Sequence, residues 1–317
     1  MNRLPTIDDI KTSELRIRPY IHRTPVLTNR TINKICSAEV FFKAENFQKV
    51  GAFKARGAVN AVFSLEEEQI SKGVATHSSG NHAAALAYAA KCRGIKAYVV
   101  MPENAPENKK AAVAGYGARI IYSESTQKAR EEMLNQIIVD TGAFFIHPYN
   151  DYRVITGQAT AAMELLKEVP TLDSLLVPVG GGGLLSGSAL IIRALSTHTL
   201  IFGTEPKRAD DAFRSLKAGY IIPQDNPVTI ADGLRTSLGD LTFPIIRDHV
   251  TDIFTVQEIE IINAMRLIWE RMKIIIEPSA AVPVAALLYR REQVPGSKIG
   301  IILSGGNADL DNLAFKS

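Results

Sequence analysis

A lysine among small and apolar residues is the side chain of this sequence best suited to covalent chemistry. Lys54 stands in the segment Gly-Ala-Phe-Lys-Ala-Arg-Gly-Ala, which covers residues 51–58. Desolvation and the nearby charge of Arg56 would both lower the pKa of the Lys54 amine, and a neutral amine is the form that makes a Schiff base. Taken alone, a lysine in such a segment is more often a surface residue on a helix, so the prediction of a reactive lysine depends on the other segments of the chain.

Four consecutive glycines predict a binding loop for an anion. Gly180, Gly181, Gly182 and Gly183 follow an apolar run and precede the apolar stretch that begins at Leu184. Without side chains, successive backbone N–H groups can converge on a phosphate, and the start of a helix adds a positive dipole end. The segment matches neither a Walker A loop nor Gly-x-Gly-x-x-Gly. A turn needed only for close packing is the alternative.

A third segment has the features of a helix N-terminus that could hold a carboxylate. Serine and asparagine are common where helices begin, and an alanine-rich stretch follows here at residues 83–90. Exposed amides at such a terminus suit a substrate carboxylate, and ordinary helix capping is the alternative. The residues of this segment are Ser78, Ser79, Gly80, Asn81 and His82.

A fourth segment, Leu-Ser-Gly-Gly-Asn at residues 303–307, places a serine at the predicted end of a strand. The hydroxyl of Ser304 could form a hydrogen bond with the nitrogen of a heterocycle. A plain turn explains this segment equally simply when it is considered alone.

The elements that must position these segments alternate between strands and helices. Short apolar runs rich in β-branched residues predict strands, and longer periodic stretches between them predict helices. This alternation implies parallel sheets covered by helices, which is the α/β class, and ligands of such sheets gather at the carboxyl ends of strands. The predicted strands are 97–101, 119–122, 144–146, 174–179, 200–203 and 298–303, and the clearest helices are 83–92, 127–139 and 154–167.

Composition excludes several other classes of protein. The chain has 317 residues, of which 46% are hydrophobic, so it can form one large domain or two domains. Its net charge of +3 is scattered, which argues against nucleic-acid binding, and no histidine pair has the spacing of a zinc site. Only two cysteines are present, and neither a secretory signal nor an apolar run of membrane-spanning length is visible. We therefore expect a cytoplasmic protein without membrane or nucleic-acid partners.

Together, the four segments closely resemble the fold-type II pyridoxal 5'-phosphate (PLP) enzymes, whose fold is that of the tryptophan synthase β chain. Within that group the sequence resembles the serine/threonine dehydratases and the serine racemases, from about Ile10 to Leu310. The resemblance implies two domains, each with a mostly parallel sheet flanked by helices. Residues 1–70 and 150–317 would form the large PLP-binding domain, and residues 71–149 the small domain that contributes the substrate carboxylate loop.

The resemblance also implies roles for individual residues of the cofactor site. Lys54 would hold PLP as an internal aldimine and serve as acid and base on one face of the substrate. Phe53 would flank the cofactor ring, Asn81 would contact its hydroxyl, and Ser304 would face the pyridine nitrogen. A neutral serine there would leave that nitrogen largely unprotonated and moderate the electron sink. The loop of Gly180, Gly181, Gly182, Gly183 and Leu184 would bind the phosphate.

On the substrate side, the loop from Ser78 to His82 would hold the carboxylate. Ser79 matches the serine that acts in racemases as the second acid and base, on the face opposite the lysine. Because the same serine occurs in dehydratases, it does not separate the two activities.

A divalent cation is a further implication of the resemblance. In the eukaryotic-type racemases, a segment like Glu-Pro-Lys-Arg-Ala-Asp-Asp binds a cation through its first glutamate, the alanine carbonyl and the last aspartate. Those positions are Glu205, Ala209 and Asp211 here. Such hard oxygen ligands suit Mg²⁺, with Ca²⁺ or Mn²⁺ as alternatives, whereas a solvated acidic turn would bind none.

Some positions depart from the family pattern. Ala52 replaces the serine usual before Phe-Lys, and Ala84 stands where ATP-binding racemases have a glutamine, so nucleotide activation is not expected. The regulatory C-terminal extension of biosynthetic threonine dehydratases is also not expected, and neither is feedback by isoleucine.

The predicted activity is PLP-dependent β-elimination, as an L-serine/L-threonine ammonia-lyase that yields a 2-oxo acid and ammonia. A serine racemase is the second hypothesis and a 3-hydroxyaspartate dehydratase the third, with Arg130 as a candidate ligand for a second substrate carboxylate. A non-catalytic PLP-binding protein is a rival that the combination of Lys54, Ser79 and Ser304 disfavours. The family also suggests a homodimer, by analogy alone.

Overall fold

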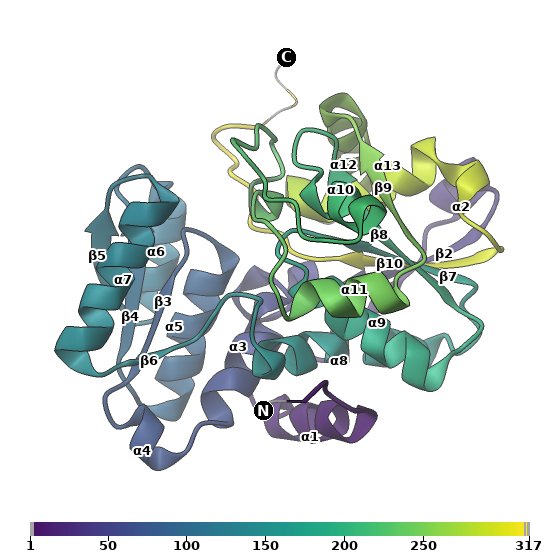
Figure 1. Ribbon diagram of the computed structural model, residues 1–317. Coiled ribbons are helices and arrows are strands. Elements are labelled where there is room, and N and C mark those ends of the chain that lie inside the picture. Colours follow the sequence, from purple (N-terminus) through teal and green to yellow (C-terminus); the bar gives the residue numbers. More distant parts are fainter. Residues whose placement is uncertain (1–2, 314, 316–317) are drawn as a thin grey trace.

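The computed structural model describes residues 3–313 and 315, apart from the side chain of Asn108 (Figure 1). Two separate sheets organise the chain, and helices pack on both of them. The larger sheet has the strand order β1-β2-β10-β7-β8-β9, and all of its pairs are parallel except β1 with β2. Its strands are β1 (Val26–Leu27), β2 (Glu39–Ala44), β7 (Ser174–Pro178), β8 (Leu200–Pro206), β9 (Asp252–Val256) and β10 (Lys298–Leu303).

The smaller sheet is entirely parallel and has the order β5-β4-β3-β6. Its strands are β3 (Val74–His77), β4 (Ala97–Pro102), β5 (Arg119–Ser123) and β6 (Phe144–Phe145). Because every strand of this sheet lies between residues 74 and 145, we propose residues 71–149 as the small domain. Residues 1–70 and 150–317 would form the large domain.

The α-helices follow the alternating order that the sequence predicts. In chain order they are α1 (Ile7–Ile17), α2 (Arg30–Cys36), α3 (Lys54–Phe63), α4 (Glu67–Ile70), α5 (Asn81–Arg93), α6 (Glu107–Gly115), α7 (Gln127–Thr141), α8 (Tyr152–Glu168), α9 (Gly183–Leu195), α10 (Asp211–Ala218), α11 (Thr242–His249), α12 (Glu258–Met272) and α13 (Pro278–Tyr289). Short 3₁₀ turns lie at Glu45–Phe47, Lys49–Gly51, Asp232–Leu234 and Arg291–Gln293.

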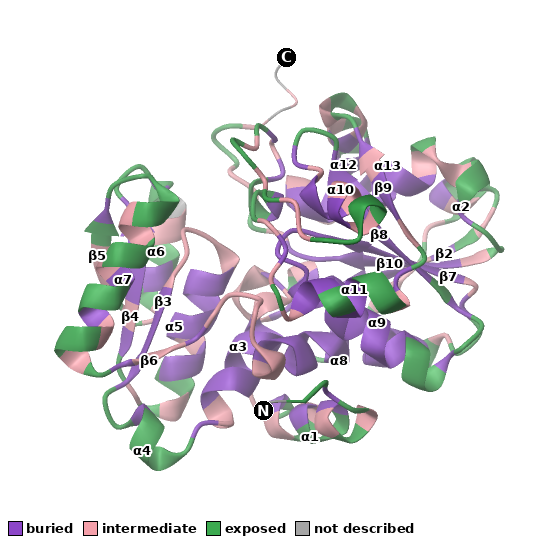
Figure 2. Cartoon of the chain, viewed as in Figure 1, coloured by how far each residue is buried: buried purple, intermediate pink, exposed green. Residues whose placement is uncertain are grey.

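Helix α8 lies at the centre of the packing around the larger sheet and is buried along most of its length (Figure 2). Glycines let its neighbours approach closely. A Cβ added at Gly157 of α8 would lie 2.6 Å from the carbonyl oxygen of Arg56 in α3, and one at Gly187 of α9 would lie 2.5 Å from the Ile155 oxygen. Helices α3, α8 and α9 therefore form one tightly packed layer, and α3 and α9 each begin in a segment predicted to bind the cofactor.

The predicted fold class is confirmed, since both sheets are parallel or mostly parallel and alternate with helices. All six predicted strands are present within a few residues of their predicted ends. Strands β1, β2, β3 and β9 were not among those predicted. Strand β1 has only two residues, and the apolar runs of the other three are interrupted by Lys43, Thr76 and Thr255. In the described part of the chain, no helix has the length and apolar character needed to cross a membrane.

Candidate functional site

The predicted loops follow the carboxyl ends of strands, as expected for an α/β sheet. Ser304 comes directly after β10, Gly180 follows β7, and Ser78 follows β3 of the smaller sheet. The Ser304 segment also meets the lysine segment through the backbone. The Phe53 N–H donates to the Ser304 carbonyl at 3.0 Å, and Ala52 forms a bridge with Gly305. Residues 52–54 and residue 304 thus belong to one structural unit, although they are far apart in the sequence.

Lys54 is the first residue of α3 and lies between the large domain and the segment that leaves the small sheet. Its Nζ donates a hydrogen bond of 2.8 Å to the carbonyl oxygen of Pro148, and it lies 5.2 Å from the centre of the Phe53 ring. Burial lowers the pKa of Lys54 to about 8, while the charge of Glu277 opposes that shift. A substantial fraction of the amine is therefore neutral near neutral pH, which nucleophilic attack on a carbonyl requires.

The expected contribution of Arg56 to this pKa was wrong. The Arg56 side chain is fully buried and is occupied by the carboxylates of Glu45 and Glu164. Its charge is not among the causes of the shift at Lys54, which burial produces. Side chains of residues that are two positions apart on a helix point in directions about 200° apart. Arg56 is therefore close to Lys54 in the sequence, but its side chain is on the other side of α3.

The four glycines form a close turn between β7 and α9. Gly182 has a φ of 89°, a conformation that favours glycine, and a Cβ there would lie 2.8 Å from the Thr242 hydroxyl. At Gly180 a Cβ would lie 3.0 Å from the Gly233 carbonyl oxygen. Helix α9 begins at Gly183, and the first N–H groups of a helix have no acceptor within it. The loop therefore satisfies both interpretations of the sequence: it is closely packed, and it ends in a helix terminus suited to an anion.

Tyr149 forms one wall of this glycine loop. A Cβ at Gly181 would lie 2.3 Å from carbons of the Tyr149 ring, and one at Gly183 would lie 3.0 Å from the tyrosine Cβ. The ring also packs edge-on against His147, with ring centres 4.6 Å apart. Tyr149 and Pro148 thus lie in one connecting segment that contacts both the glycine loop and Lys54.

The predicted carboxylate loop precedes α5, a helix of 13 residues. The cap residue is Gly80, and among the described residues no side chain caps this terminus, so the alternative of ordinary side-chain capping is not supported. Ser78 holds the turn instead, because its hydroxyl accepts a hydrogen bond of 3.3 Å from the Gly80 N–H. Ser79 is partly exposed at the centre of the loop. The amides at this terminus remain suited to a carboxylate.

Asn81 joins the predicted carboxylate loop to segments that adjoin the larger sheet. Its Nδ2 donates to both carboxylate oxygens of Glu277, at 2.9 and 3.1 Å, and its Oδ1 accepts from Asn307 at 2.8 Å. Glu277 is buried, and burial followed by the charge of Asp232 raises its pKa to about 7. Glu277 was not among the predicted site residues, although the segment from Trp269 to Pro278 that contains it also resembles the family, and its position directly before Pro278 at the start of α13 is a further signal.

The histidines around Lys54 are held in the neutral form. Burial, followed by the charge of Lys54, places the pKa of His82 well below its ordinary value. Burial, followed by His77 and Lys54, lowers the pKa of His147 to about 4. Within the described part of the chain, the Nδ1 atom of His82 is buried without a hydrogen-bond partner. The site therefore carries a neutral imidazole beside its lysine.

Arg130 lies near the same loop. Its Nε donates to the Thr126 carbonyl at 3.3 Å, and burial lowers its pKa. The charge of Arg130 also contributes, after burial, to the lowered pKa of His77, the residue that immediately precedes Ser78. This cation is thus close enough to the carboxylate loop to act on it electrostatically.

An ion pair crosses between the two sheets beside the loop. Lys109 of α6 pairs with Asp232, which lies in the turn next to the glycine loop. A Cβ at Gly80 would lie 4.0 Å from the Lys109 Nζ, so this cation stands close to the carboxylate loop. The contacts of Asn81 and of Lys109 together connect the small sheet to the large domain.

The predicted cation ligands lie apart from these loops, at the end of β8 and the start of α10. Glu205 and Asp211 are both fully buried. Glu205 accepts from the N–H groups of Ala212 and Phe213, at 3.1 and 2.8 Å, and Asp211 accepts from the Leu238 N–H at 3.1 Å. Burial raises the pKa of Glu205 well above its ordinary value, with Asp211 as the second cause, and raises that of Asp211 to about 7.

Glu205 and Asp211 form no ion pair with any described residue, although the charge of Arg214 favours the ionised form of Asp211, so two such buried carboxyl groups need a proton or a metal ion to be stable there. One oxygen of Asp211 is buried and has no hydrogen-bond partner within residues 3–313 and 315. The same residues contain no group of three His, Cys, Asp or Glu side chains placed to hold a metal, so backbone oxygens such as that of Ala209 would have to complete the set. The donors present fit a hard divalent cation.

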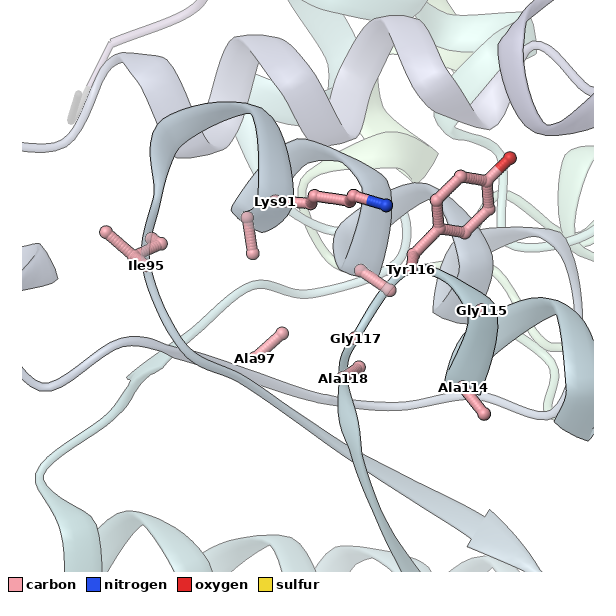
Figure 3. Close-up of a pocket in the computed structure, with 10 residues that line it drawn as sticks. Lys91, Ile95, Ala97, Ala114, Gly115, Tyr116, Gly117 and Ala118 are labelled. Carbon is pink, nitrogen blue, oxygen red and sulfur yellow. The ribbon is translucent and has the colours of Figure 1, made fainter.

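A depression of about 340 Å³ lies elsewhere on the small sheet's side, between α5 and the end of α6 (Figure 3). Lys91 and Tyr116 extend over it, and small residues such as Gly117 and Ala118 form its floor. None of its lining residues belongs to the predicted cofactor or substrate site.

Comparisons with known proteins agree with this geometry. Residues 17–305 match the family model described as "Pyridoxal-phosphate dependent enzyme". The chain is 50% identical to the β-hydroxyaspartate dehydratase of Paracoccus denitrificans (strain Pd 1222), over 98% of this chain and 99% of that protein. It is also 50% identical to the serine racemase of Dictyostelium discoideum, over 98% of this chain and 97% of that one.

Among solved structures, maize serine racemase superposes with a TM-score of 0.96 at 48% identity, over 98% of this chain and 95% of that one. The agreement extends over both sheets. The chain therefore belongs to the family of pyridoxal-phosphate dependent enzymes, in the fold-type II group that its sequence motifs resemble.

Proposed function

We propose that this protein catalyses the β-elimination of a hydroxy amino acid, as an ammonia-lyase that converts L-serine or L-threonine to a 2-oxo acid and ammonia. The observation that carries the proposal is the position of Lys54, which is held beside Ser304 through the backbone of Phe53 and has a pKa of about 8. An amine that is partly neutral at physiological pH can make a Schiff base and afterwards accept a proton.

The residues present fit PLP as the cofactor. A glycine loop in which a Cβ at Gly181 or Gly182 would clash ends in the N-terminus of α9, where amides can hold a phosphate, and Leu184 would contribute one of them. Ser304 would face the pyridine nitrogen, Phe53 would flank the ring, and Asn81 would contact the ring hydroxyl. When bound, PLP supplies an electron sink for a negative charge at the substrate Cα.

Residues of the protein would bind the substrate and transfer the protons. The amides of the loop from Ser78 to His82 would orient the substrate carboxylate, and His82 adds no positive charge there because it is neutral. The freed Lys54 amine would remove the Cα proton. Departure of the β-hydroxyl, with a proton, leaves an enamine that hydrolyses to the 2-oxo acid and ammonia.

Two related activities have specific support. The relatives described above are a serine racemase and a β-hydroxyaspartate dehydratase, each at 50% identity. For racemisation, Ser79 would return a proton to the Cα on the face opposite Lys54. For 3-hydroxyaspartate, the second carboxylate would meet Arg130, whose charge already acts on His77 next to the loop.

One assay tests the proposal and ranks these substrates. Purified protein loaded with PLP is incubated with L-serine, D-serine, L-threonine or 3-hydroxyaspartate, and both the 2-oxo acid and the enantiomer of the amino acid are measured. We expect 2-oxo acid from at least one L-substrate. Protein that binds PLP covalently and yet changes none of the four substrates would contradict the proposed activity.

The Ser79 hydroxyl gives a prediction that separates elimination from racemisation. In Ser79→Ala we expect D-serine formation to fall by about 10²-fold or more, because the proton donor on that face is lost, while 2-oxo acid release continues. Both products are followed in the same reaction mixture. The matched control is Ser78→Ala, which loosens the turn at Gly80 and should lower both products alike. A Ser79→Ala enzyme that retains D-serine formation would refute the role of Ser79.

We also propose that Glu205, Asp211 and the Ala209 carbonyl bind a divalent cation, Mg²⁺ in the first instance and Ca²⁺ or Mn²⁺ otherwise. The expected result is that saturating Mg²⁺ raises the melting temperature of EDTA-treated protein by about 5 °C, because a bound cation neutralises two buried carboxylates. Asp211→Asn should abolish this shift. Asp210→Asn is the control, since the Asp210 side chain pairs with Arg214 at 2.8 Å. An equal response to Mg²⁺ in wild type and Asp211→Asn would exclude the site.

We propose a cytoplasmic homodimer that acts on a small amino-acid substrate, on the basis of composition and of analogy with the family. Light scattering coupled to gel filtration tests the dimer directly.

A further inference from the structure

Arg56 lies at the centre of a buried cluster of charges behind the cofactor site. Its Nε and Nη2 atoms donate to the two oxygens of Glu45, at 2.7 and 2.8 Å. Its Nη1 and Nη2 atoms donate to the two oxygens of Glu164, both at 2.8 Å, and Nη1 also donates to Thr160 at 3.1 Å. Five short hydrogen bonds therefore engage the planar guanidinium group, and the side chains of Arg56 and Glu45 are fully buried.

Lys43 completes this cluster and makes it electrically neutral. Its Nζ donates to Glu164 and to the Thr24 carbonyl, both at 2.6 Å, and its side chain is fully buried. The Thr24 hydroxyl donates to Glu45 at 2.5 Å. We call Lys43, Glu45, Arg56 and Glu164 the buried ion cluster. It contains two cations and two anions, and each charge has a partner of opposite sign.

The cluster joins three elements, each of which leads directly into the cofactor site. Arg56 lies in the first turn of α3, two residues after Lys54. Lys43 lies near the end of β2, whose last residue Ala44 is in register with Leu303, the residue before Ser304. Glu164 lies on α8, which packs beside α3 and follows the segment that contains Pro148 and Tyr149 (Figure 1).

A buried ion cluster of this kind is better explained by a role in positioning the elements around it than by a contribution to the stability of the fold. Buried ion pairs gain little net free energy over well-packed apolar residues, because removing the charges from water is costly. Arginine, however, offers a rigid fork whose donors match carboxylates in direction as well as in distance. When carboxylates bind the guanidinium on both sides, the first turn of α3 can neither rotate about the helix axis nor slide along it relative to β2 and α8.

We infer that Arg56, held by Glu45 and Glu164, is the positioning residue for Lys54: it fixes the direction from which the lysine side chain enters the cofactor site. The two side chains leave the helix about 200° apart, so Arg56 acts through the backbone of α3 and does not touch the cofactor. The inference rests on the role proposed for Lys54. It adds that correct placement of this lysine depends on residues on the opposite face of its helix.

Two charge-balanced double variants separate positioning from stability. Arg56→Met with Glu45→Gln removes one cation and one anion, releases α3, and leaves the Lys43–Glu164 pair intact. Lys43→Met with Glu164→Gln also removes one cation and one anion from the same cluster, but it leaves both hydrogen bonds from Arg56 to Glu45 and keeps one side-chain carbonyl oxygen at position 164 that can accept from the other side of the fork. Both are prepared as PLP-loaded holoenzyme. Their melting temperature, kcat and KM for the preferred substrate, and visible cofactor spectrum between about pH 6 and 9 are measured.

For the first double variant we expect kcat to fall by about 10²-fold with little change in KM, together with a shift in the pH titration of the cofactor spectrum. Misplacement of a reacting group by about 1 Å has an effect of this size on rate. The second double variant should lose less than about tenfold in kcat and keep the wild-type titration. Equal losses in the two variants, or a loss of melting temperature with kcat and spectrum unchanged, would show that the cluster is only structural.

A single substitution keeps the test available if the first double variant does not fold. Arg56→Lys keeps the charge but loses the fork, so we expect a lower kcat and an altered cofactor titration in protein that still binds PLP. An Arg56→Lys enzyme with wild-type kcat and spectrum would overturn the inference. Failure of the proposed function is distinguishable, because in that case wild-type protein itself would show no covalent cofactor or no activity.

Discussion

Replacing Lys54 by alanine is expected to remove covalent cofactor binding and to lower the elimination rate by about 10³-fold or more. The physical reason is that the same amine makes the bond to PLP and accepts the Cα proton. Visible absorbance of the loaded protein and 2-oxo acid release measure the two losses separately. Lys128→Ala, at a highly exposed lysine of α7, is the matched control and should retain both properties. A Lys54→Ala protein with unchanged absorbance and activity would overturn the assignment of this residue.

The lowered pKa of Lys54 predicts how the rate of covalent PLP binding depends on pH. Because burial lowers the pKa of Lys54 to about 8, the neutral amine becomes the main form above that pH and the ammonium below it. The rate at which apoprotein combines covalently with PLP should therefore rise as the pH approaches about 8 and level off above it. Stopped-flow absorbance after mixing apoprotein with PLP measures this rate, and a rate that falls over this interval would contradict the assignment.

The second large effect is expected at Gly181. A methyl group there would lie 2.3 Å from carbons of the Tyr149 ring, so Gly181→Ala must displace either the ring or the glycine loop. Overpacking of this kind costs about 1–3 kcal/mol, which corresponds to roughly 5- to 150-fold weaker PLP binding if the loop moves. The measurement is the dissociation constant of PLP from fluorescence titration of apoprotein.

Two companion variants make this prediction specific. Gly115→Ala, at the end of α6, adds the same methyl group where no other atom lies within 4 Å, and it should leave PLP affinity unchanged. Adding Tyr149→Ala to Gly181→Ala should recover part of the lost affinity, because the clashing ring is gone. Gly181→Ala protein with wild-type affinity for PLP would show that the loop tolerates displacement and is not the phosphate site.

The parts of the site that could be predicted from the sequence are those carried by short contiguous segments. The glycine loop, the turn before α5 and the serine after β10 each have a local composition that indicates a local geometry, and for the first and last of them the preceding strand was also predicted. The lysine was found because three such segments accompanied it. Strands β2, β3 and β9 were missed because a polar or charged residue interrupts the apolar run of each, and β1 because it has only two residues.

What the sequence could not show are contacts between side chains far apart in the chain. Glu277 meets Asn81 across 196 positions, and Glu164 meets Arg56 across 108. The first contact makes a buried glutamate part of the site. The second explains why the expected electrostatic effect of Arg56 on Lys54 is not seen, because carboxylates pair with that guanidinium. Such pairings depend on how α3, α8 and α13 are packed, which no local pattern encodes.

The backbone contact between Phe53 and Ser304 has a consequence for how the protein is made. The two residues are 251 positions apart, and β2, which precedes the lysine segment, pairs in the sheet with β10, which precedes Ser304. During synthesis, the lysine segment therefore emerges long before the segment that it contacts. The nascent chain cannot assemble the pocket proposed for PLP until it has been extended through Ser304, and the pocket closes through a long-range contact of the kind that forms slowly in folding.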